Sequence, residues 1–266
     1  MHDRFSSLNF SIYNSSQAVA LYGKASSLQP AELTLYEDLR DALPAMDMLD
    51  VGVGAGRTTA FFAPHVKSYI GLDFAPSMVD AAKARFPALD IRVVDATNLD
   101  FLPDASHDLI LFSFNGLDCM TMDNRERALA EFLRLLRPGG HLIFSSHNIN
   151  FLPDLTRGFR PGMAAHPVKL LKSLKRFARF LLVNRNVTYA NDMKTALVFE
   201  RHLGFEFPLL FIRPDHQVAE LARLGWSGAR AFASDTGKRL DGPAALRGVD
   251  SPWVYYHCRK PDAAMA

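Results

Sequence analysis

Residues 49–57 have the sequence LDVGVGAGR, and this stretch decides the fold. The run over 46–53 is apolar apart from its acids, as expected for a buried strand, and three glycines end it. Glycine lets the backbone approach a ligand and adopt conformations closed to residues with a Cβ atom. A helical pattern begins at Arg57. The stretch therefore predicts a strand, a tight turn and a helix, with or without a ligand at the turn.

Outward from this stretch, short apolar strands alternate with helices. We expect strands over 46–53, 69–74, 91–94, 108–114 and 142–146, and helices over 30–43, 57–62, 76–85 and 124–136. Such alternation is typical of parallel βαβ units with right-handed crossovers. The sequence therefore predicts an α/β, doubly wound sheet.

The alternation stops after His147 and resumes at Asp215. We expect residues 148–213 to form an insertion or lid subdomain after the fifth strand. It would contain an amphipathic helix over 167–183 and a hairpin whose strands cover 196–201 and 205–212, with a bend at Gly204. A helix over 215–224 and strands near 229–233 and 253–257 then complete the sheet. No linker marks an independent unit, so residues 1–266 are expected to form a single domain that carries this insertion.

Composition narrows the class of protein. Hydrophobic residues make up 48% and charged residues 22%, which predicts a packed core. The formal net charge of +2 gives no indication of a nucleic-acid partner. The two cysteines, Cys119 and Cys258, are too few for a disulfide scaffold or a cysteine zinc site and fit a reducing compartment. Without a signal-peptide pattern or an apolar run of membrane-spanning length, the expected location is cytoplasmic.

Carboxylates recur where the first three strands end. The carboxyl ends of parallel strands meet at one edge, which is where such sheets bind ligands. Asp73, at the end of the second strand, can accept two hydrogen bonds from a ribose, or it can cap the next helix. Asp95 and the backbone N–H of Ala96 can bind an adenine edge, or Asp95 can be a turn residue. A dinucleotide fingerprint would need glycine where Arg57 stands, so the spacing disfavours NAD.

The ordered series LDVGVGAGR at 49–57, GLD at 71–73, VDA at 94–96 and LRPGG at 136–140 resembles the class I S-adenosylmethionine (SAM) dependent methyltransferases. The resemblance is dense over 46–147 and weak towards the C-terminus. It implies SAM as cofactor, S-adenosyl-L-homocysteine as product, and a seven-stranded, mostly parallel sheet in which only the last strand is antiparallel.

The same resemblance assigns the cofactor site. It places Asp73 at the ribose and Asp95 with Ala96 at the adenine. Tyr22, near the N-terminus, would touch the methionine end of SAM, or it would pack against the sheet edge. The remaining expected cofactor residues surround the methionine part, flank the adenosine or lie in the stretch after the fourth strand: Asp50, Gly52, Gly54, Gly56, Ser77, Met78 and Asn115.

Two residues near the ends of the fourth and fifth strands are candidates for the chemistry. Methyl transfer needs a nucleophile held in line with the methyl group, and a hydroxyl or ammonium acceptor must also lose a proton. His147 is the candidate proton acceptor, and Asp118 is the candidate for orienting an amine. Each has a structural alternative, as a hydrogen-bonded core residue or as a cap. No cluster has metal-ligand spacing, so no metal is expected.

The expected insertion, which is basic, is the part of the sequence that bears on the substrate. On the expected helix over 167–183, one face is apolar and the opposite face is largely basic; the apolar residues are Leu170, Leu171, Leu174, Phe177, Leu181 and Leu182. We expect a lid whose apolar face is buried on the catalytic domain. The alternative is peripheral contact with an anionic membrane or an acidic substrate.

The expected function is methyl transfer from SAM to O or N of a small molecule. Residues 112–118 and 144–148 resemble methyltransferases of glycan and natural-product pathways, which suggests a sugar or a carrier-linked sugar as acceptor. Residues 115–118 lack the Asn/Asp-Pro-Pro-Tyr/Phe motif of enzymes that methylate nucleic-acid amino groups, so a nucleic-acid partner is not expected. The alternatives are a nicotinamide-dependent Rossmann oxidoreductase and a SAM-binding regulator without turnover. The oligomeric state stays open.

Overall fold

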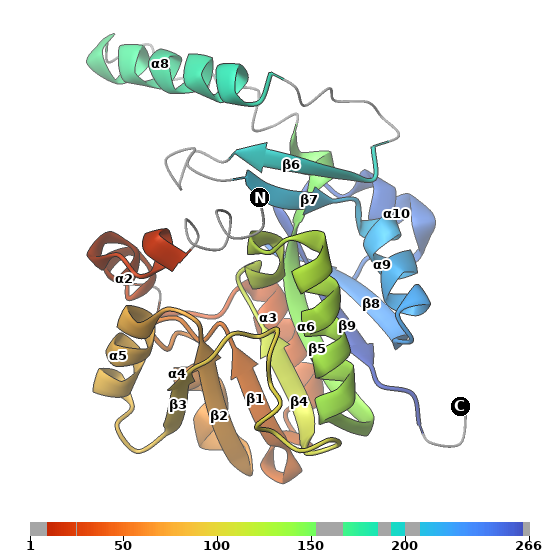
Figure 1. Ribbon diagram of the computed structural model, residues 1–266. Coiled ribbons are helices and arrows are strands. Elements are labelled where there is room, and N and C mark those ends of the chain that lie inside the picture. Colours follow the sequence, from red (N-terminus) through yellow and green to blue (C-terminus); the bar gives the residue numbers. More distant parts are fainter. Residues whose placement is uncertain (1–9, 25, 153–166, 186–192, 200–207, 263–266) are drawn as a thin grey trace.

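The computed structural model describes residues 10–24, 26–152, 167–185, 193–199 and 208–262. Within these ranges the chain forms a nine-stranded sheet with helices on both faces (Figure 1). Its parallel half runs in the order β3-β2-β1-β4-β5. These strands are β1 (Asp47–Val51), β2 (Ser68–Asp73), β3 (Asp90–Val93), β4 (His107–Phe112) and β5 (Leu136–Asn148).

Helices precede the first strand of this parallel half, fill its connections and, as a 3-10 turn, follow its last strand. They are α2 (Ser16–Tyr22), α3 (Pro30–Leu39), α4 (Thr59–Phe62), α5 (Pro76–Arg85) and α6 (Met122–Leu135), with short 3-10 turns η1 (Leu43–Ala45), η2 (Ala63–His65), η3 (Gly116–Cys119) and η4 (Ile149–Phe151). Alternate residues of β1 point to opposite faces. Met48 packs into the core under α3, whereas Leu49 and Val51 pack into the core under α6.

The C-terminal strands extend the sheet beyond β5. β9 (Trp253–Arg259) pairs antiparallel with β5, and β8 (Ser227–Ala233) pairs antiparallel with β9. The order β3-β2-β1-β4-β5-β9-β8 is therefore the predicted seven-stranded sheet in which only the last strand of the chain is reversed. Helices α9 (Pro214–Arg223) and α10 (Gly242–Gly248) accompany these strands. The α/β fold class predicted from the sequence is confirmed.

Two further strands and a helix lie in the segment after β5. Helix α8 (Pro167–Val183) has the expected bounds, and β6 (Thr195–Phe199) pairs antiparallel with β7 (Pro208–Ile212). β7 in turn pairs in parallel with the last two residues of β5. The expected bend at Gly204 lies outside the described residues. That residues 1–266 form one domain stays a prediction.

The expected burial of the apolar face of α8 is wrong for four of its six residues, because Leu171, Leu174, Leu181 and Leu182 are exposed. Leu174 is 40% exposed and Leu181 is 47% exposed, whereas Phe180, on another side of the helix, is buried. Phe177 is half-buried, and the side chain of Leu170 lies outside the described residues. Helical periodicity identified an apolar stripe, but the helix contacts the β6–β7 hairpin along a different edge.

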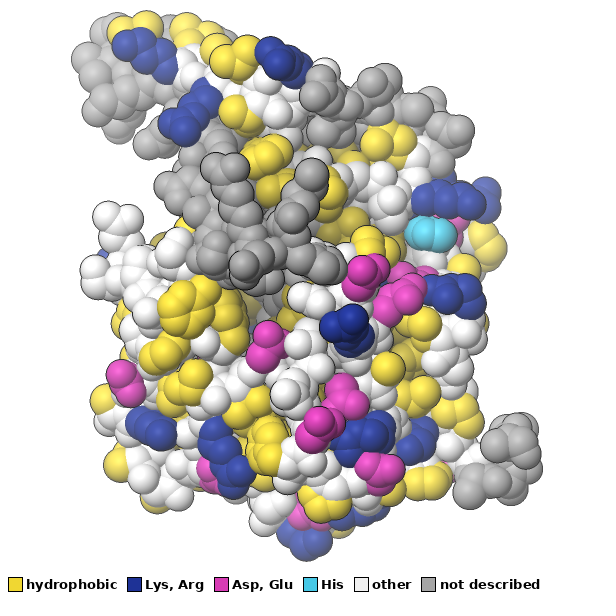
Figure 2. Space-filling model, viewed as in Figure 1, with side chains coloured by type: hydrophobic (Ala, Val, Ile, Leu, Met, Phe, Trp, Pro, Cys, Tyr) yellow, Lys and Arg dark blue, Asp and Glu magenta, His cyan; other side chains and the backbone are white. Residues whose placement is uncertain are grey.

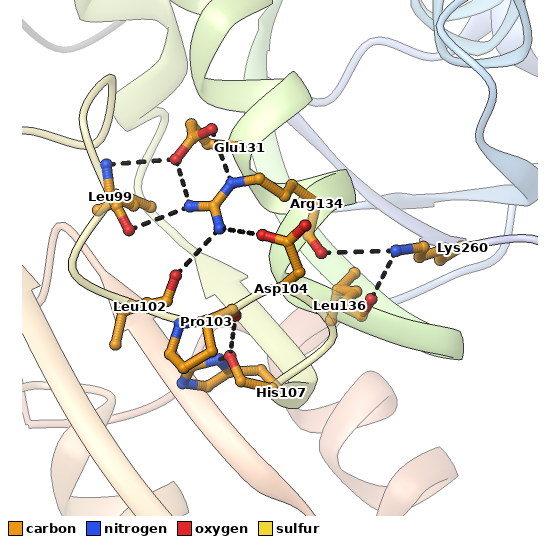
Figure 3. A network of polar contacts seen from close by, with 10 residues as sticks. Leu99, Leu102, Pro103, Asp104, His107, Glu131, Arg134, Leu136 and Lys260 are labelled. Carbon is orange, nitrogen blue, oxygen red and sulfur yellow. Dashed lines mark hydrogen bonds and ion pairs between the residues drawn. The ribbon is translucent and has the colours of Figure 1, made fainter.

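At the amino end of β4, one arginine of α6 holds the chain that leads into the strand (Figure 3). The Arg134 guanidinium donates to the carbonyl oxygens of Leu99 and Leu102, both at 3.0 Å, and to Asp104 Oδ1 at 2.6 Å. Glu131, one turn earlier on α6, also accepts from Arg134 at 2.7 Å. These contacts fix the β3–β4 connection at the edge of the sheet where β4 begins.

No helix within the described ranges has the length and apolarity to cross a membrane.

A buried ion pair joins α6 to α9. Arg125, which is fully buried, donates from Nη1 to Glu220 Oε2 at 2.7 Å and from Nη2 to Gln217 Oε1. Gln217 Nε2 also donates to Glu220 Oε2 at 2.8 Å. Arg223 and Glu126 form a second ion pair between the same helices at 2.7 Å, but its side chains are 62% and 45% exposed.

The two pairs differ in burial, so Arg125→Ala should lower the free energy of unfolding by about 3–5 kcal/mol, because Glu220 would be left buried without its counter-charge. Arg223→Ala is the matched control on the same helix pair and should cost less than about 1 kcal/mol. Urea unfolding of both variants measures the difference. Equal losses of unfolding free energy would show that burial does not determine how much each ion pair contributes to stability.

Candidate functional site

A pocket opens at the carboxyl edge of the parallel strands. Its walls come from the turn after β1, the ends of β2 and β4, the segment after β3, and two tyrosines of the N-terminal segment. The expected cofactor residues that line it are Tyr22, Gly52, Gly54, Asp73, Met78, Asp95 and Ala96. The structure therefore brings together residues that are up to 74 positions apart (Tyr22 to Ala96) in the sequence.

The glycine turn forms the floor of the pocket. Gly52 and Gly54 have φ angles of 64° and 55°, which residues with a Cβ atom rarely adopt. A Cβ atom at Gly52 would lie 2.6 Å from the Phe112 ring, whereas one at Gly54 would meet nothing within 4 Å. Gly54 thus presents bare backbone to open space inside the pocket, as a cradle for a closely approaching ligand requires.

Asp73 is anchored by the backbone around it. Its Oδ2 accepts from Gly54 N and its Oδ1 from Ala75 N, both at 2.9 Å. Burial raises the pKa of this carboxyl to about 6, against the opposing effect of these N–H donors. The carboxylate lines the pocket and keeps lone pairs for two further donors, which is what the two hydroxyls of a ribose offer.

The adenine side of the expected site is more open. Asp95 is exposed, and its Oδ1 accepts from both the backbone N and Oγ1 of Thr97, each at 2.8 Å. Ala96 and Met78 are buried in the pocket wall. Ser77 lies behind the wall, where its Oγ donates to the Asn14 carbonyl oxygen at 2.8 Å and so holds the N-terminal segment against α5.

Three other expected cofactor residues also lie one layer behind the lining: Asp50, Gly56 and Asn115. Asp50 is 1% exposed, and its Oδ2 accepts from Thr58 Oγ1 and from the Tyr69 hydroxyl, both at 2.7 Å. Burial raises its pKa to about 6, although these two hydroxyl donors oppose the rise. Asp50 therefore supports the turn from below.

Arg57 occupies the position where a dinucleotide site has its third glycine. Its guanidinium forms two 2.6 Å hydrogen bonds with Glu32 of α3 and lies 4.1 Å from the centre of the Phe114 ring. Ser113 and Tyr255 also donate to Glu32. Through Glu32, the Arg57 side chain links the turn, α3, the end of β4 and β9.

Beyond β4, the chain turns sharply and leads to Asp118, which contacts the other candidate catalytic residue, His147 of β5. Phe114 and Asn115 both have positive φ angles, 55° and 61°. Asp118 is fully buried and accepts from His147 through both the backbone N, at 2.6 Å, and Nδ1, at 2.7 Å. Its other oxygen accepts from Ser146 Oγ at 2.7 Å.

His147 faces Asn115 with its second nitrogen. The distance from His147 Nε2 to Asn115 Nδ2 is 3.4 Å, and the imidazole packs against Phe211 with centroids 4.8 Å apart. With Nδ1 protonated and held by Asp118, Nε2 is the basic nitrogen. Neither His147 nor Asp118 lines the pocket; His147 is 4% exposed and lies behind Asn115.

Other lining residues were not among the site residues expected from the sequence. They are mainly apolar or weakly polar and include Tyr13, Phe74, Val94, Phe112, Ser113, Phe114, Gly116, Cys119, Met120, Thr121 and Asn124. Tyr13 and Cys119 meet across the pocket, with the hydroxyl 3.3 Å from Sγ. The concentration of aromatic residues over 112–114 was the available signal, but alone it indicates only a buried strand end.

The residues present fit SAM in two respects. The bare backbone at Gly54 leaves space for a ligand, and the Asp73 carboxylate within the pocket suits a ribose. Across the described ranges, no group of three or more His, Cys, Asp or Glu side chains is arranged to hold a metal ion.

Known proteins match the same part of the chain. Residues 48–140 match the family model of a methyltransferase domain. A demethylmenaquinone methyltransferase of Renibacterium salmoninarum is 37% identical over 109 residues, which are 41% of this chain and 44% of that protein. A malonyl-[acyl-carrier protein] O-methyltransferase of Serratia marcescens is 31% identical over 147 residues, 52% and 56% of the two chains. The chain thus matches these curated relatives over about half of their length.

Solved structures share the fold over a longer span. The 1,6-didemethyltoxoflavin-N1-methyltransferase of Burkholderia thailandensis, solved with 1,6-didemethyltoxoflavin and S-adenosylhomocysteine, superposes with a TM-score of 0.63 at 16% identity, covering 98% of this chain and 91% of that one. The N-methyltransferase NodS of Bradyrhizobium japonicum gives a TM-score of 0.51 at 16% identity, covering 87% and 86%. The sequence matches, together with the strand order and the ordered motifs, show that residues 48–140 belong to a methyltransferase domain of the class I SAM-dependent type, with SAM as the cofactor of this domain.

Proposed function

We propose that the chain transfers a methyl group from SAM to an oxygen or nitrogen atom of a small molecule. One observation carries the proposal: a single pocket joins the glycine turn and Asp73 to a second, mostly apolar wall that the cofactor motifs do not contribute. SAM would bind along the first wall, with its ribose on Asp73 and its adenine beside Asp95. The second wall, around Phe114, Cys119 and Met120, would receive the acceptor.

The lining of the second wall favours an acceptor with an apolar or aromatic portion. Flat apolar rings pack well against aromatic side chains, whereas a bare sugar would leave its hydroxyls short of partners there. The sugar suggested by the sequence resemblance therefore fits best in a carrier-linked form. Two relatives point the same way, since a demethylmenaquinone and a malonyl group on a carrier protein are the acceptors that their names give.

Methyl transfer requires the protein mainly to position the acceptor atom. SAM supplies an activated methyl group, so the residues must hold the acceptor atom in line with it and remove a proton where the acceptor carries one. We propose His147 as that proton acceptor and Asp118 as the residue that orients it. Asp118 fixes Nδ1, which leaves Nε2 as the base. The base becomes available to an acceptor when the Asn115 side chain gives way.

Two alternatives were open from the sequence. The methyltransferase-domain match over residues 48–140 argues against the nicotinamide-dependent oxidoreductase, as does Arg57, which is bound to Glu32 at the third-glycine position. A SAM-binding regulator without turnover has the same cofactor site. Turnover alone distinguishes it from an enzyme.

The test of the proposal is methyl transfer from labelled SAM to a panel of acceptors, with free sugars, carrier-linked sugars and prenylated or plain aromatic hydroxyl compounds as its arms. We expect labelled product and S-adenosylhomocysteine with at least one apolar or carrier-linked acceptor, and no label on free sugars. Calorimetry should show micromolar binding of SAM, about −8 kcal/mol, and no comparable binding of NAD. Tight SAM binding with no product across the whole panel would favour the regulator.

The pH dependence of cofactor binding tests the role of Asp73. Because burial raises its pKa to about 6, the ionised form that accepts the ribose hydroxyls is lost as pH falls below that value. Affinity for S-adenosylhomocysteine should therefore be constant above about pH 7 and fall by up to about tenfold per pH unit below 6. At pH 7.5, Asp73→Asn should weaken binding by roughly 1.5–3 kcal/mol.

Asp50 serves as the internal control for this titration, since burial raises its pKa to about 6 as well. It remains in the Asp73→Asn variant, so that variant should bind weakly but with little dependence on pH. If the variant retains the full pH dependence, the titrating group is not Asp73.

Removal of the proposed base should separate turnover from cofactor binding. His147→Ala should lower turnover by about 10²–10⁴ while affinity for S-adenosylhomocysteine changes little, because the imidazole does not line the pocket and lies apart from the glycine turn and Asp73. Asp118→Asn should lower turnover less, since the imidazole remains but is held less well. Near-normal turnover of His147→Ala on the true acceptor would leave positioning alone as the source of catalysis.

A further inference from the structure

Helix α8 presents a row of exposed leucines. The exposed fractions are 55% for Leu171, 40% for Leu174, 47% for Leu181 and 63% for Leu182. At about 100° of rotation per residue, these four side chains leave the helix within an arc of roughly 100°. They therefore form one continuous apolar stripe, which we call the leucine stripe, and not four scattered positions.

The leucine stripe points outward because the opposite edge of α8 is attached to the rest of the chain. Phe180 is 8% exposed and packs in a cluster with Ala196 and Val198 of β6. Just after the helix, the Asn184 side chain donates to the Phe199 carbonyl oxygen at 3.0 Å and accepts from Phe199 N at 2.8 Å. The helix is thus held to the hairpin through one edge, which leaves the leucine stripe facing away from it.

Basic residues accompany the leucine stripe. By sequence, α8 contains five lysines and arginines and no acid. Lys175 and Arg179 are exposed and follow Leu182 around the helix, about 20° and 60° further on. α8 stands apart from the body of the molecule in Figure 1, and Figure 2 shows hydrophobic and basic side chains next to each other at that end.

Folded proteins seldom leave such an apolar stripe exposed to water. A partner that covers it should offer an apolar phase for the leucines and negative charge for the basic residues beside them. The surface of an anionic bilayer offers both: acyl chains for the leucines and phosphate headgroups for the basic flank. We propose that α8 lies in the interface of an anionic lipid membrane, with the leucine stripe in the acyl region and Lys175 and Arg179 at the headgroups. This inference concerns where the chain docks and does not depend on the proposed methyl transfer.

Flotation of the full-length chain with vesicles tests the proposal. We expect binding to phosphatidylcholine vesicles that contain about one-third phosphatidylglycerol, weaker binding at high salt, and little binding to pure phosphatidylcholine. Lys175→Glu with Arg179→Glu should weaken binding on the order of tenfold or more, since each basic residue near an anionic surface contributes about 1 kcal/mol. Leu174→Ser with Leu181→Ser should abolish it.

Matched controls are available on other elements. Leu33→Ser removes a leucine that is 51% exposed on α3, and Lys238→Glu reverses an exposed charge before α10; neither should change vesicle binding. Affinity for S-adenosylhomocysteine should be unchanged in the α8 variants, which shows that they are folded and keeps the outcome separate from that of the proposed function. No binding to anionic vesicles, or binding that the α8 variants leave intact, would overturn the proposal. Light scattering tests for a dimer. A dimer that the double variant Leu174→Ser with Leu181→Ser dissociates would also overturn the proposal, because it would assign the leucine stripe to a second copy of the chain.

Discussion

The arrangement of the site depends on the buried ion pair between Arg57 and Glu32. The guanidinium comes directly after the glycine turn, and the carboxylate, 1% exposed, belongs to α3. Ser113 at the end of β4 and Tyr255 of β9 complete the carboxylate's partners. Charges this deeply buried are tolerated only when each has its full set of partners. Four elements that are remote in sequence are therefore fixed in one arrangement, and the backbone of the cofactor turn is fixed with them.

The two halves of the sheet have separate tasks. The half built from β1, β2 and β3 supplies the glycine turn, Asp73 and Asp95, which lie at the carboxyl ends of these strands or directly after them. The other half, from β4 onward, supplies the apolar wall and the pair of Asp118 and His147. The halves meet at Phe114, whose ring lies over Arg57 and within 5.3 Å of the Trp253 ring, centre to centre.

Much of the fold could be predicted because its signals are local. Strand lengths, the glycines and the recurrence of helical patterns all follow from neighbouring residues, and even the insertion helix was placed with its observed bounds. The site could be predicted only in part. Strand-end position placed Asp50 at the right edge of the sheet, but its side chain points to Thr58 and Tyr69 below the turn. The outward leucines of α8 were missed because periodicity defines a stripe and not the neighbour that it faces.

His147 is the residue at which β5 changes neighbours. It is the last residue of β5 in register with β9, opposite Trp253, and the first in register with β7, opposite Phe211. Beyond β5 the sheet therefore branches: one branch continues through β9 and β8, and the other carries the hairpin of β6 and β7, to which α8 is attached. The backbone of His147 is therefore held by β9 and by β7 at the same residue. The hairpin and α8 thus join the parallel sheet at the residue that carries the proposed base.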